Sequence, residues 1–304
     1  MEMLEAKWLT RLDPGRLFSL QGQVAVVTGA AGGVGRWLSA GFGLARASLL
    51  VTDRADEELD RLADELAGLG IVAEAFACEL AAPDAAERVV EAAVDRLGRV
   101  DVLVNNAGIN RRIPMLEVDA DVLDEIWRVD YIRCYQLSQA AARVMISQGG
   151  GSIIHVGSVN NVFGLEDVSM LGPTKAALSQ LAKAMTVELA HLGIRTNVLA
   201  PGFLDTPMNA THWEDPTRGP WIMDRVPMHR PGHPAELVGT ALLMASPAGS
   251  FLSGQTIYVD GGVTAGSRWN IPASAGLEAF SRWVAEGKPI REFERRERLG
   301  TTES

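Results

Sequence analysis

The sequence predicts an α/β fold in which helices flank a doubly wound, seven-stranded parallel sheet. Short apolar runs alternate with longer amphipathic stretches, which is the order of repeated strand–helix units. Several runs are apolar at successive positions, as expected for strands buried on both faces of a parallel sheet. The expected strands are 24–27, 48–51, 71–77, 100–104, 152–156, 197–200 and 256–259. The stretch 175–190 is apolar at helical spacing.

The chain of 304 residues is long enough for one large domain or two small ones. It contains no internal repeat and no low-complexity linker. We expect a single core domain over residues 20–266, an N-terminal arm over residues 1–19 and a C-terminal tail over residues 267–304. The charge-dense run 291–298 within this tail is typical of a solvated helix face.

Composition excludes several functional classes. The formal net charge is -10, so the chain has no global attraction for phosphate backbones and we do not expect nucleic acid as a partner. Two cysteines, Cys78 and Cys134, cannot form a disulfide scaffold and fit a reducing cytoplasm. The start of the chain lacks the apolar core of a secretory signal, and no apolar run is long enough to span a membrane. We therefore expect a cytoplasmic protein that does not span or bind a membrane. We also expect no metal site.

A glycine-rich turn follows the first expected strand. Residues 28–35 read TGAAGGVG, and a strand, a glycine turn and a helix form the Rossmann geometry that lays a pyrophosphate on a helix N-terminus. Asp53 ends the second strand, where a carboxylate can accept hydrogen bonds from an adenosine ribose and would repel a 2′-phosphate. This favours NAD over NADP, although Arg54 next to it weakens the preference. Asp53 could instead cap the helix expected over 56–69.

With these features the chain resembles the short-chain dehydrogenase/reductase family. Four motifs occur in the order of that family: the glycine turn, NNAG at 105–108, PG at 201–202 followed by Thr206, and SGQ and VDGG between 253 and 262. The resemblance covers about residues 20–266. The stretches NNAGINRR, PGFLDTPMN and SGQTIYVDGGVTAG look like the gluconate 5-dehydrogenase and 2-deoxygluconate dehydrogenase subgroup, which transfers hydride between NAD(P) and sugar acids or polyols.

The resemblance implies a nicotinamide dinucleotide site, with NAD as the expected cofactor. Thr206 would hydrogen-bond the nicotinamide carboxamide, and Glu79 stands where the family usually has an aspartate that contacts adenine. The cofactor-binding positions that the resemblance implies are Gly29, Gly33, Val34, Gly35, Asp53, Arg54, Glu79, Leu80, Asn106, Ala107, Gly108, Lys175, Pro201, Gly202 and Thr206.

The catalytic positions of the family are matched only in part. Its chemistry uses Asn, Ser, Tyr and Lys; Ser158 and Lys175 match, but the tyrosine position holds Leu171 and the asparagine position holds Asp130. A leucine side chain cannot donate or accept a proton. We therefore expect an atypical site with Ser158, Lys175 and Asp130 as catalytic candidates. We also expect the Asp130 carboxylate to neutralise the Lys175 ammonium, directly or through a water molecule.

Other groups could replace the missing phenol, and the sequence leaves them open. Tyr131 adjoins Asp130, but neighbouring helical side chains point about 100° apart. His155 could equally be a buried, hydrogen-bonded core residue. Glu166 and Asp167 precede Leu171 in a loop, where carboxylates are mostly solvated.

Candidate substrate-binding residues lie just after the motifs that are expected to bind the cofactor. Arg111 and Arg112 come after the NNAG turn and could hold a carboxylate, although a surface loop or a subunit contact would use them as well. Asn160 could bind a hydroxyl group or satisfy a turn. The long, proline-rich stretch 203–230 is typical of a lid, with His212 and Trp213 as pocket candidates.

Three functional hypotheses remain at this point. The first is an NAD(H)-dependent oxidoreductase that acts on a sugar acid, a polyol or a related alcohol or carbonyl compound. The alternatives are an NAD-binding pseudoenzyme with a regulatory role, and a lyase or isomerase without redox chemistry on the same scaffold. By resemblance we also expect a homodimer or homotetramer, assembled through the helices that hold Asp130 and Lys175.

Overall fold

The computed structural model describes residues 9, 12–54, 57–266, 282 and 285–287. The chain divides into two compact units, Met1–Gly266 and Ser267–Ser304. Most of the expected C-terminal tail, including 267–281 and 288–304, lies outside the described residues, as does most of the first half of the expected N-terminal arm. The fold described below is that of the first unit.

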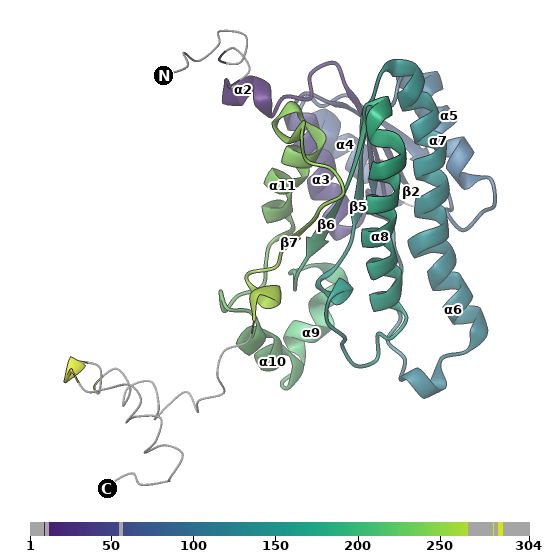
Figure 1. The fold of residues 1–304 in the computed structure, drawn as a ribbon. Helices are drawn as coiled ribbons and strands as arrows, with labels where there is room; N and C mark the ends of the chain where they lie inside the picture. Colours follow the sequence, from purple (N-terminus) through teal and green to yellow (C-terminus); the bar gives the residue numbers. More distant parts are fainter. Residues whose placement is uncertain (1–8, 10–11, 55–56, 267–281, 283–284, 288–304) are drawn as a thin grey trace, which may run out of the picture. The chain divides into compact units, whose positions relative to one another are not determined.

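One parallel sheet of seven strands forms the centre of this unit, which confirms the predicted fold class (Figure 1). The strand order is β3-β2-β1-β4-β5-β6-β7, so the order reverses between β1 and β4. In doubly wound sheets of this kind, ligands bind outside the carboxyl ends of the strands at such a reversal. The strands are β1 Val24–Thr28, β2 Ser48–Asp53, β3 Ala73–Ala77, β4 Val102–Asn105, β5 Gly151–Val156, β6 Ile194–Pro201 and β7 Thr256–Val259.

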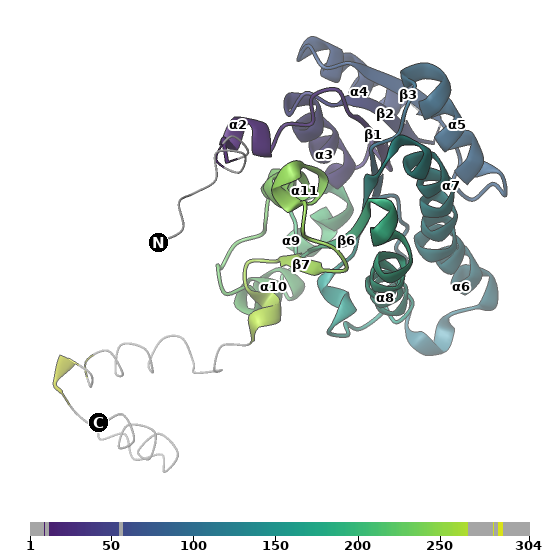
Figure 2. The same cartoon turned by 45° about the horizontal axis from the view of Figure 1, so that its top comes forward.

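Helices cover both faces of the sheet, and the two views in Figures 1 and 2 show α3 and α11 on one face and α5, α7 and α8 on the other. The helices are α2 Pro14–Leu17, α3 Gly33–Leu44, α4 Glu57–Gly68, α5 Ala85–Leu97, α6 Ala120–Trp127, α7 Arg133–Gln148, α8 Leu171–Leu189, α9 Ala210–Glu214, α10 Arg218–Arg225 and α11 Val238–Ala245. Short 3-10 turns connect several of them. Among the described residues, no helix is long and apolar enough to cross a membrane.

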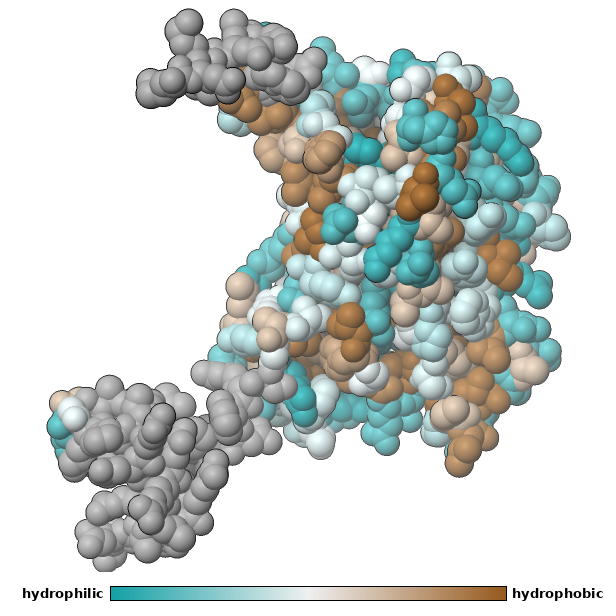
Figure 3. Space-filling view, in the orientation of Figure 1, coloured by the Kyte–Doolittle hydropathy of each residue, from teal (hydrophilic) through white to brown (hydrophobic). Residues whose placement is uncertain are grey.

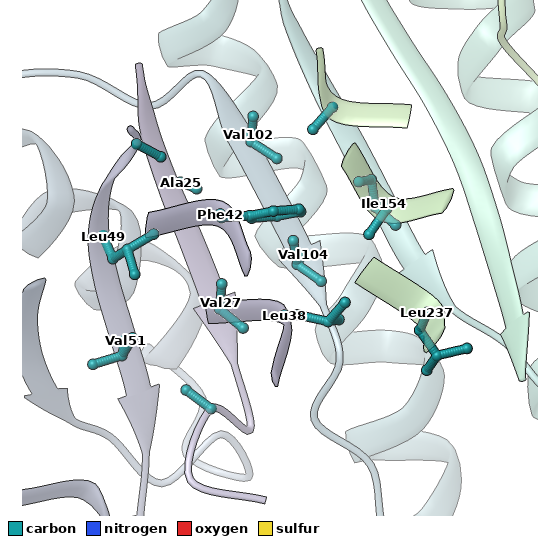
Figure 4. Close-up of a cluster of buried hydrophobic side chains, with 14 of the residues drawn as sticks. Ala25, Val27, Leu38, Phe42, Leu49, Val51, Val102, Val104, Ile154 and Leu237 are labelled. Carbon is teal, nitrogen blue, oxygen red and sulfur yellow. The ribbon is translucent and has the colours of Figure 1, made fainter. Parts of the chain in front are cut away.

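The strands are apolar on both faces because each face packs against a helical layer. Val27 and Val51 belong to the core cluster under α3, α4 and α11, whereas Val26 and Leu50 belong to the cluster under α5 and α7. Successive strand residues point to opposite faces, so this alternation follows from the strand geometry. Phe42 of α3 is fully buried in the first cluster, which Figure 4 shows in detail.

A π-helical turn, Arg128–Ile132, joins α6 to α7. Insertions of this kind inside α-helices occur frequently at functional sites because they redirect a side chain that a regular helix would place elsewhere. The turn carries Val129 and Asp130 as its buried residues. It therefore brings a carboxylate to the interior beside the sheet.

Candidate active site

A cavity of about 1020 Å³ lies at the carboxyl edge of the sheet. Its walls come from the glycine turn after β1, the ends of β2, β4, β5 and β6, the start of α8, and α10. All predicted catalytic residues line it. Of the predicted cofactor residues, all but Gly35 line it as well.

The glycine turn packs directly against the turn that follows β4. Gly29 has a φ of +60°, and a Cβ built there would lie 2.7 Å from the Cα of Ala107. The Asn106 amide donates hydrogen bonds to the carbonyls of Thr28 and Gly29, each at 2.9 Å. The backbone therefore faces the cavity with no side chain in between, as a cradle for a pyrophosphate at the start of α3 requires.

The structure corrects the interpretation of Gly35 as a ligand contact. Gly35 lies behind the turn, where an added Cβ would overlap the carbonyl oxygen of Gly29. Its role is close packing of α3 against the turn. Gly33 does line the cavity, and a Cβ there would lie 3.0 Å from the Cγ2 of Thr206, so the glycine turn and the Thr206 segment also meet.

Two carboxylates lie in the cavity wall where an adenosine would follow the pyrophosphate. Asp53 ends β2 and accepts hydrogen bonds from the backbone N–H of Ala31 at 3.0 Å and of Arg54 at 2.9 Å. The described part of the next helix, α4, begins at Glu57. Glu79 accepts from the N–H of Ala81 at 3.0 Å. The residues of this wall could hold a nucleoside, with Asp53 positioned beside the glycine turn.

The inner end of the cavity contains a buried ion pair. The Nζ of Lys175 lies 3.3 Å from Oδ2 of Asp130, and their side chains are 10% and 0% exposed. The other oxygen, Oδ1, accepts a hydrogen bond from the N–H of Ile109 at 2.8 Å. The direct pairing of Asp130 with Lys175 that the sequence predicted is therefore present.

Gly108 covers this ion pair. A Cβ built on Gly108 would lie 3.2 Å and 3.3 Å from the two carboxylate oxygens of Asp130 and 3.3 Å from Nζ of Lys175. Contacts that short require the neighbouring atoms to move. The NNAG turn thus brings a glycine and the N–H of Ile109 to the pair, so the turn holds the carboxylate as well as lining the cavity.

Ser158 is oriented by the short turn that follows β5. Its hydroxyl oxygen accepts from the N–H of Asn160 at 3.1 Å, and its own N–H donates to the Asn161 side chain at 3.2 Å. Asn161 in turn donates to the hydroxyl of Ser179 on α8, at 2.6 Å. The helix that carries Lys175 and the turn that carries Ser158 are therefore joined by hydrogen bonds. Asn161 fulfils the turn-forming role, whereas Asn160 lines the cavity.

Leu171 is the first residue of α8 and lines the cavity one helical turn before Lys175. Residues four apart on a helix share a face, so both side chains lie on the side that faces Ser158 and the cavity. The leucine side chain contributes apolar surface to the cavity and carries no titratable group.

Two of the alternative proton-transfer groups do not line the cavity. Tyr131 packs edge-to-face on Trp127, with ring centroids 5.6 Å apart. His155 is fully buried, with its Nδ1 3.1 Å from the Asn105 amide nitrogen. Burial, and secondarily the Lys175 charge, lowers the pKa of His155 to about 3. Glu166 and Asp167 do line the cavity.

The two predicted arginines have different environments. Arg111 makes hydrogen bonds from Nε and Nη2 to the carboxylate of Glu125, at 3.1 Å and 2.8 Å, and is not among the described residues that line the cavity. This corrects its assignment as a substrate residue. Arg112 lines the cavity, and burial followed by the charge of Arg218 lowers its pKa, while Asp167 opposes the shift.

One face of α10 forms the outer wall of the cavity, and none of its residues was among the predicted site residues. Its lining residues are Arg218, Trp221, Ile222 and Arg225. This spacing of three, four and seven residues is the signature of one helix face and could have identified them. Arg218 also lies 3.6 Å from Asp167, which has a φ of +64°. Trp213 does not appear in the described lining, and the side chain of His212 lies outside the described residues.

Comparison with known proteins gives concordant results. Residues 29–264 match the family model described as enoyl-(acyl carrier protein) reductase. The chain is 33% identical over 247 residues to a 5-keto-D-gluconate 5-reductase of Escherichia coli strain K12. The aligned region covers 81% of this chain and 97% of that protein. It is 34% identical to the gluconate 5-dehydrogenase of Gluconobacter oxydans over 82% of this chain and 97% of that protein.

A solved structure is similar in fold as well. The gluconate 5-dehydrogenase of Burkholderia cenocepacia, crystallised with NADP and tartrate, superposes with a TM-score of 0.80 at 34% identity. The match covers 83% of this chain and 99% of that chain.

The ion pair gives a prediction for stability. Asp130→Ala should lower the free energy of unfolding by about 3 kcal/mol, because it leaves the buried Lys175 ammonium without a counter-charge. Asp130→Asn also removes the counter-charge but keeps an oxygen for the N–H of Ile109, so it should be less destabilising than Asp130→Ala by about 1 kcal/mol. Urea unfolding at pH 7 measures both, with the exposed Asp124→Ala of α6 as the control. Equal effects of Asp130→Ala and Asp124→Ala would contradict the assignment.

His155 gives a prediction for pH dependence. Its pKa in the folded state, about 3, lies below the ordinary value of 6.5, so the unfolded chain binds the additional proton between these values. Stability should therefore fall as pH falls below 6.5, by about 1.4 kcal/mol per pH unit from this group. His155→Gln should remove that slope between pH 6 and pH 4 in urea unfolding, whereas the exposed His191→Gln should leave it. An unchanged slope in His155→Gln would refute the buried neutral state.

Proposed function

The chain belongs to the short-chain dehydrogenase/reductase family, and we propose that it is an NAD(H)-linked oxidoreductase that interconverts a carbonyl and an alcohol on a small polyhydroxy acid. The observation that carries the proposal is the single cavity. It joins the glycine cradle to Ser158 and the Lys175–Asp130 pair, and continues to Arg112 at its outer wall. The cofactor, the reacting carbon and the acid group would thus share one cavity.

The proposed roles follow from position along this cavity. When bound, a nicotinamide dinucleotide supplies or accepts a hydride. The backbone of the glycine turn would bind its pyrophosphate, and Thr206, which is buried and contacts the turn at Gly33, would orient the nicotinamide. Ser158 would hold the substrate oxygen through its hydroxyl. Lys175 would place a positive charge beside the same oxygen.

We propose NAD over NADP because of the charge at the ribose wall. The Asp53 carboxylate is held in place by two backbone N–H groups and would lie beside a 2′-phosphate, which it would repel. Arg54 is exposed and lines the same wall, so it could accommodate such a phosphate in part. The related Burkholderia protein was crystallised with NADP.

The charge of the outer wall supports an acidic substrate. Arg112 and Arg218 both line it, and a guanidinium forms paired hydrogen bonds with a carboxylate. Asn160 and Asn110 line the same region, and each has a buried amide oxygen without a protein partner among the described residues, which suits hydroxyl donors. The relatives named for gluconate and keto-gluconate chemistry are consistent with such a substrate.

Leu171 favours a second candidate function. A chain that binds the nucleotide without turnover would serve as a regulatory partner, and an apolar residue where the family has its phenol is the expected mark of that state. The buried pair of Lys175 and Asp130 argues against it, because a site without chemistry gains little from a costly buried ion pair.

We further propose a homo-oligomer assembled through α7 and α8. Ile132 lies in the turn before α7, Tyr135 and Ile146 lie on α7 and Val187 lies on α8, and all four are exposed. Figure 3 shows apolar patches scattered among polar surface on the face in view. Exposed apolar side chains on neighbouring helices are typical of subunit contacts.

Nucleotide binding tests the cofactor assignment. In calorimetric titrations, NADH should bind at least about tenfold more tightly than NADPH, and Asp53→Asn should narrow that difference by removing the repulsion of the 2′-phosphate. Arg54→Gln is the matched variant, because it should weaken NADPH without affecting NADH. Tighter binding of NADPH by the unaltered chain would contradict the preference, and no binding of either would refute the proposed function.

Arg112 and its neighbour Arg111 test the substrate assignment. Arg112→Ala should raise KM for keto and hydroxy acids by about 10-fold to 100-fold, because a charge-assisted pair contributes about 1.5–3 kcal/mol. It should leave KM for neutral polyols unchanged. Arg111→Ala, which removes a guanidinium bound to Glu125, should change neither. Nicotinamide absorbance during turnover measures all of these, and equal effects of the two variants would rule out a specific carboxylate contact.

A further inference from the structure

We infer that Lys175 is itself the proton donor of this site, and that the chain is built for carbonyl reduction rather than alcohol oxidation. The inference rests on the proposed function and names the group that acts in it. It is based on which side chains at the inner end of the cavity bear a proton and on the contacts that these side chains make.

Of the side chains described at this inner end, only Lys175 can give up a proton. Asp130 is fully buried, and its two oxygens are engaged by the N–H of Ile109 and by Lys175. Leu171 carries no transferable proton, and the hydroxyl of Ser158 is too weak an acid to supply one at neutral pH. A lysine carries an ammonium at neutral pH and therefore has a proton to give.

Three of the other candidates, Asp167, His155 and Cys134, are set apart by their place or their contacts. Asp167 lines the outer wall of the cavity, where its carboxylate is paired with Arg218 at 3.6 Å. His155 and Cys134 are buried and do not line the cavity; burial lowers the pKa of the first to about 3 and raises that of the second to about 12. Neither exchanges a proton with the cavity near neutral pH.

The geometry leaves Lys175 access to the substrate oxygen. An ammonium has three N–H donors, and its ion pair with Asp130, at 3.3 Å, leaves donors for a substrate oxygen. The 10% exposure of the side chain is toward the cavity, since both Lys175 and Leu171 line it from the same face of α8. Leu171 lines the same cavity as Lys175 and Ser158 and offers no group that could relay the proton.

The step balances with the reduced nicotinamide dinucleotide as the named reductant. A hydride is added to the carbonyl carbon, and the π-electron pair of the C=O bond moves to the oxygen. One N–H bond of Lys175 breaks as that oxygen takes the proton, which leaves an alcohol, a neutral amine and the oxidised dinucleotide. The amine regains a proton from solvent after the products leave. The opposite direction requires the neutral amine as its base, and a lysine is mostly an ammonium at neutral pH, so the site favours reduction.

Two substitutions separate proton donation from charge. Lys175→Arg keeps the positive charge, but a guanidinium does not release a proton at neutral pH. We expect Lys175→Arg and Lys175→Met to lower kcat for reduction of a keto acid by at least about 100-fold. Because arginine keeps the positive charge, Lys175→Arg should still bind NADH in calorimetric titrations and should still unfold cooperatively on heating. Lys183→Met, an exposed lysine on the same helix, is the control and should be fully active.

Chemical rescue provides a second test that does not depend on how arginine fits. Lys175→Ala should recover part of its turnover with added methylammonium and none with added guanidinium, because only the first can donate a proton. Substantial activity of Lys175→Arg, or equal rescue by both cations, would show that Lys175 acts through its charge alone and would overturn the inference.

Leu171→Tyr separates failure of the inference from failure of the proposed function. The unaltered chain could bind NADH but be inactive while Leu171→Tyr is active. The site would then accept the substrate without Lys175 supplying the proton. In that case the inference is wrong, and the cofactor and substrate assignments stand. If neither turns over any keto acid or polyol, the proposed function itself is contradicted. Turnover by the unaltered chain, lost in Lys175→Arg, supports both.

Discussion

The buried ion pair between Lys175 and Asp130 is the constraint on which the rest of the site depends. Removing two charges from water costs several kcal/mol per ion, and well-packed apolar residues would often be more stable at such positions. The chain nevertheless bends α6 into α7 through a π-helical turn to bring Asp130 inward. It also places Gly108 where any larger residue would crowd both charges. A cost of this kind is understandable where the charge serves the chemistry in the cavity.

The sheet explains how segments distant in sequence supply this site. The carboxyl ends of β1 and β4 meet where the strand order reverses, so the glycine turn and the NNAG turn pack against each other. Asn106 joins them by hydrogen bonds, and Ile109 extends the same turn to Asp130. On the other side, Asn161 ties the turn that carries Ser158 to α8. Cofactor cradle and acid group are therefore held by one continuous set of backbone and side-chain contacts.

The fold and the centre of the site could be predicted from the sequence because both depend on local pattern. Continuous apolar runs identified the strands, and the resemblance to the short-chain dehydrogenase/reductase family placed Ser158, Lys175 and Asp130 together. What could not be predicted depends on side-chain direction. Nothing in the sequence distinguishes Arg111 from Arg112, because the difference is the contact of Arg111 with Glu125 on another element. The α10 wall was missed because its apolar and basic residues are spaced as a helix inside a stretch that reads as a loop.

The account is tested most directly by a crystal structure of the complex with oxidised nicotinamide dinucleotide and an unreactive hydroxy acid. It predicts that the hydroxyl oxygen lies within hydrogen-bond distance, about 2.7–3.2 Å, of both Ser158 Oγ and Lys175 Nζ, with Asp130 still paired to the lysine. An oxygen bound by Ser158 but more than about 5 Å from Nζ, or a proton-bearing side chain other than Lys175 in contact with it, would contradict the central claim.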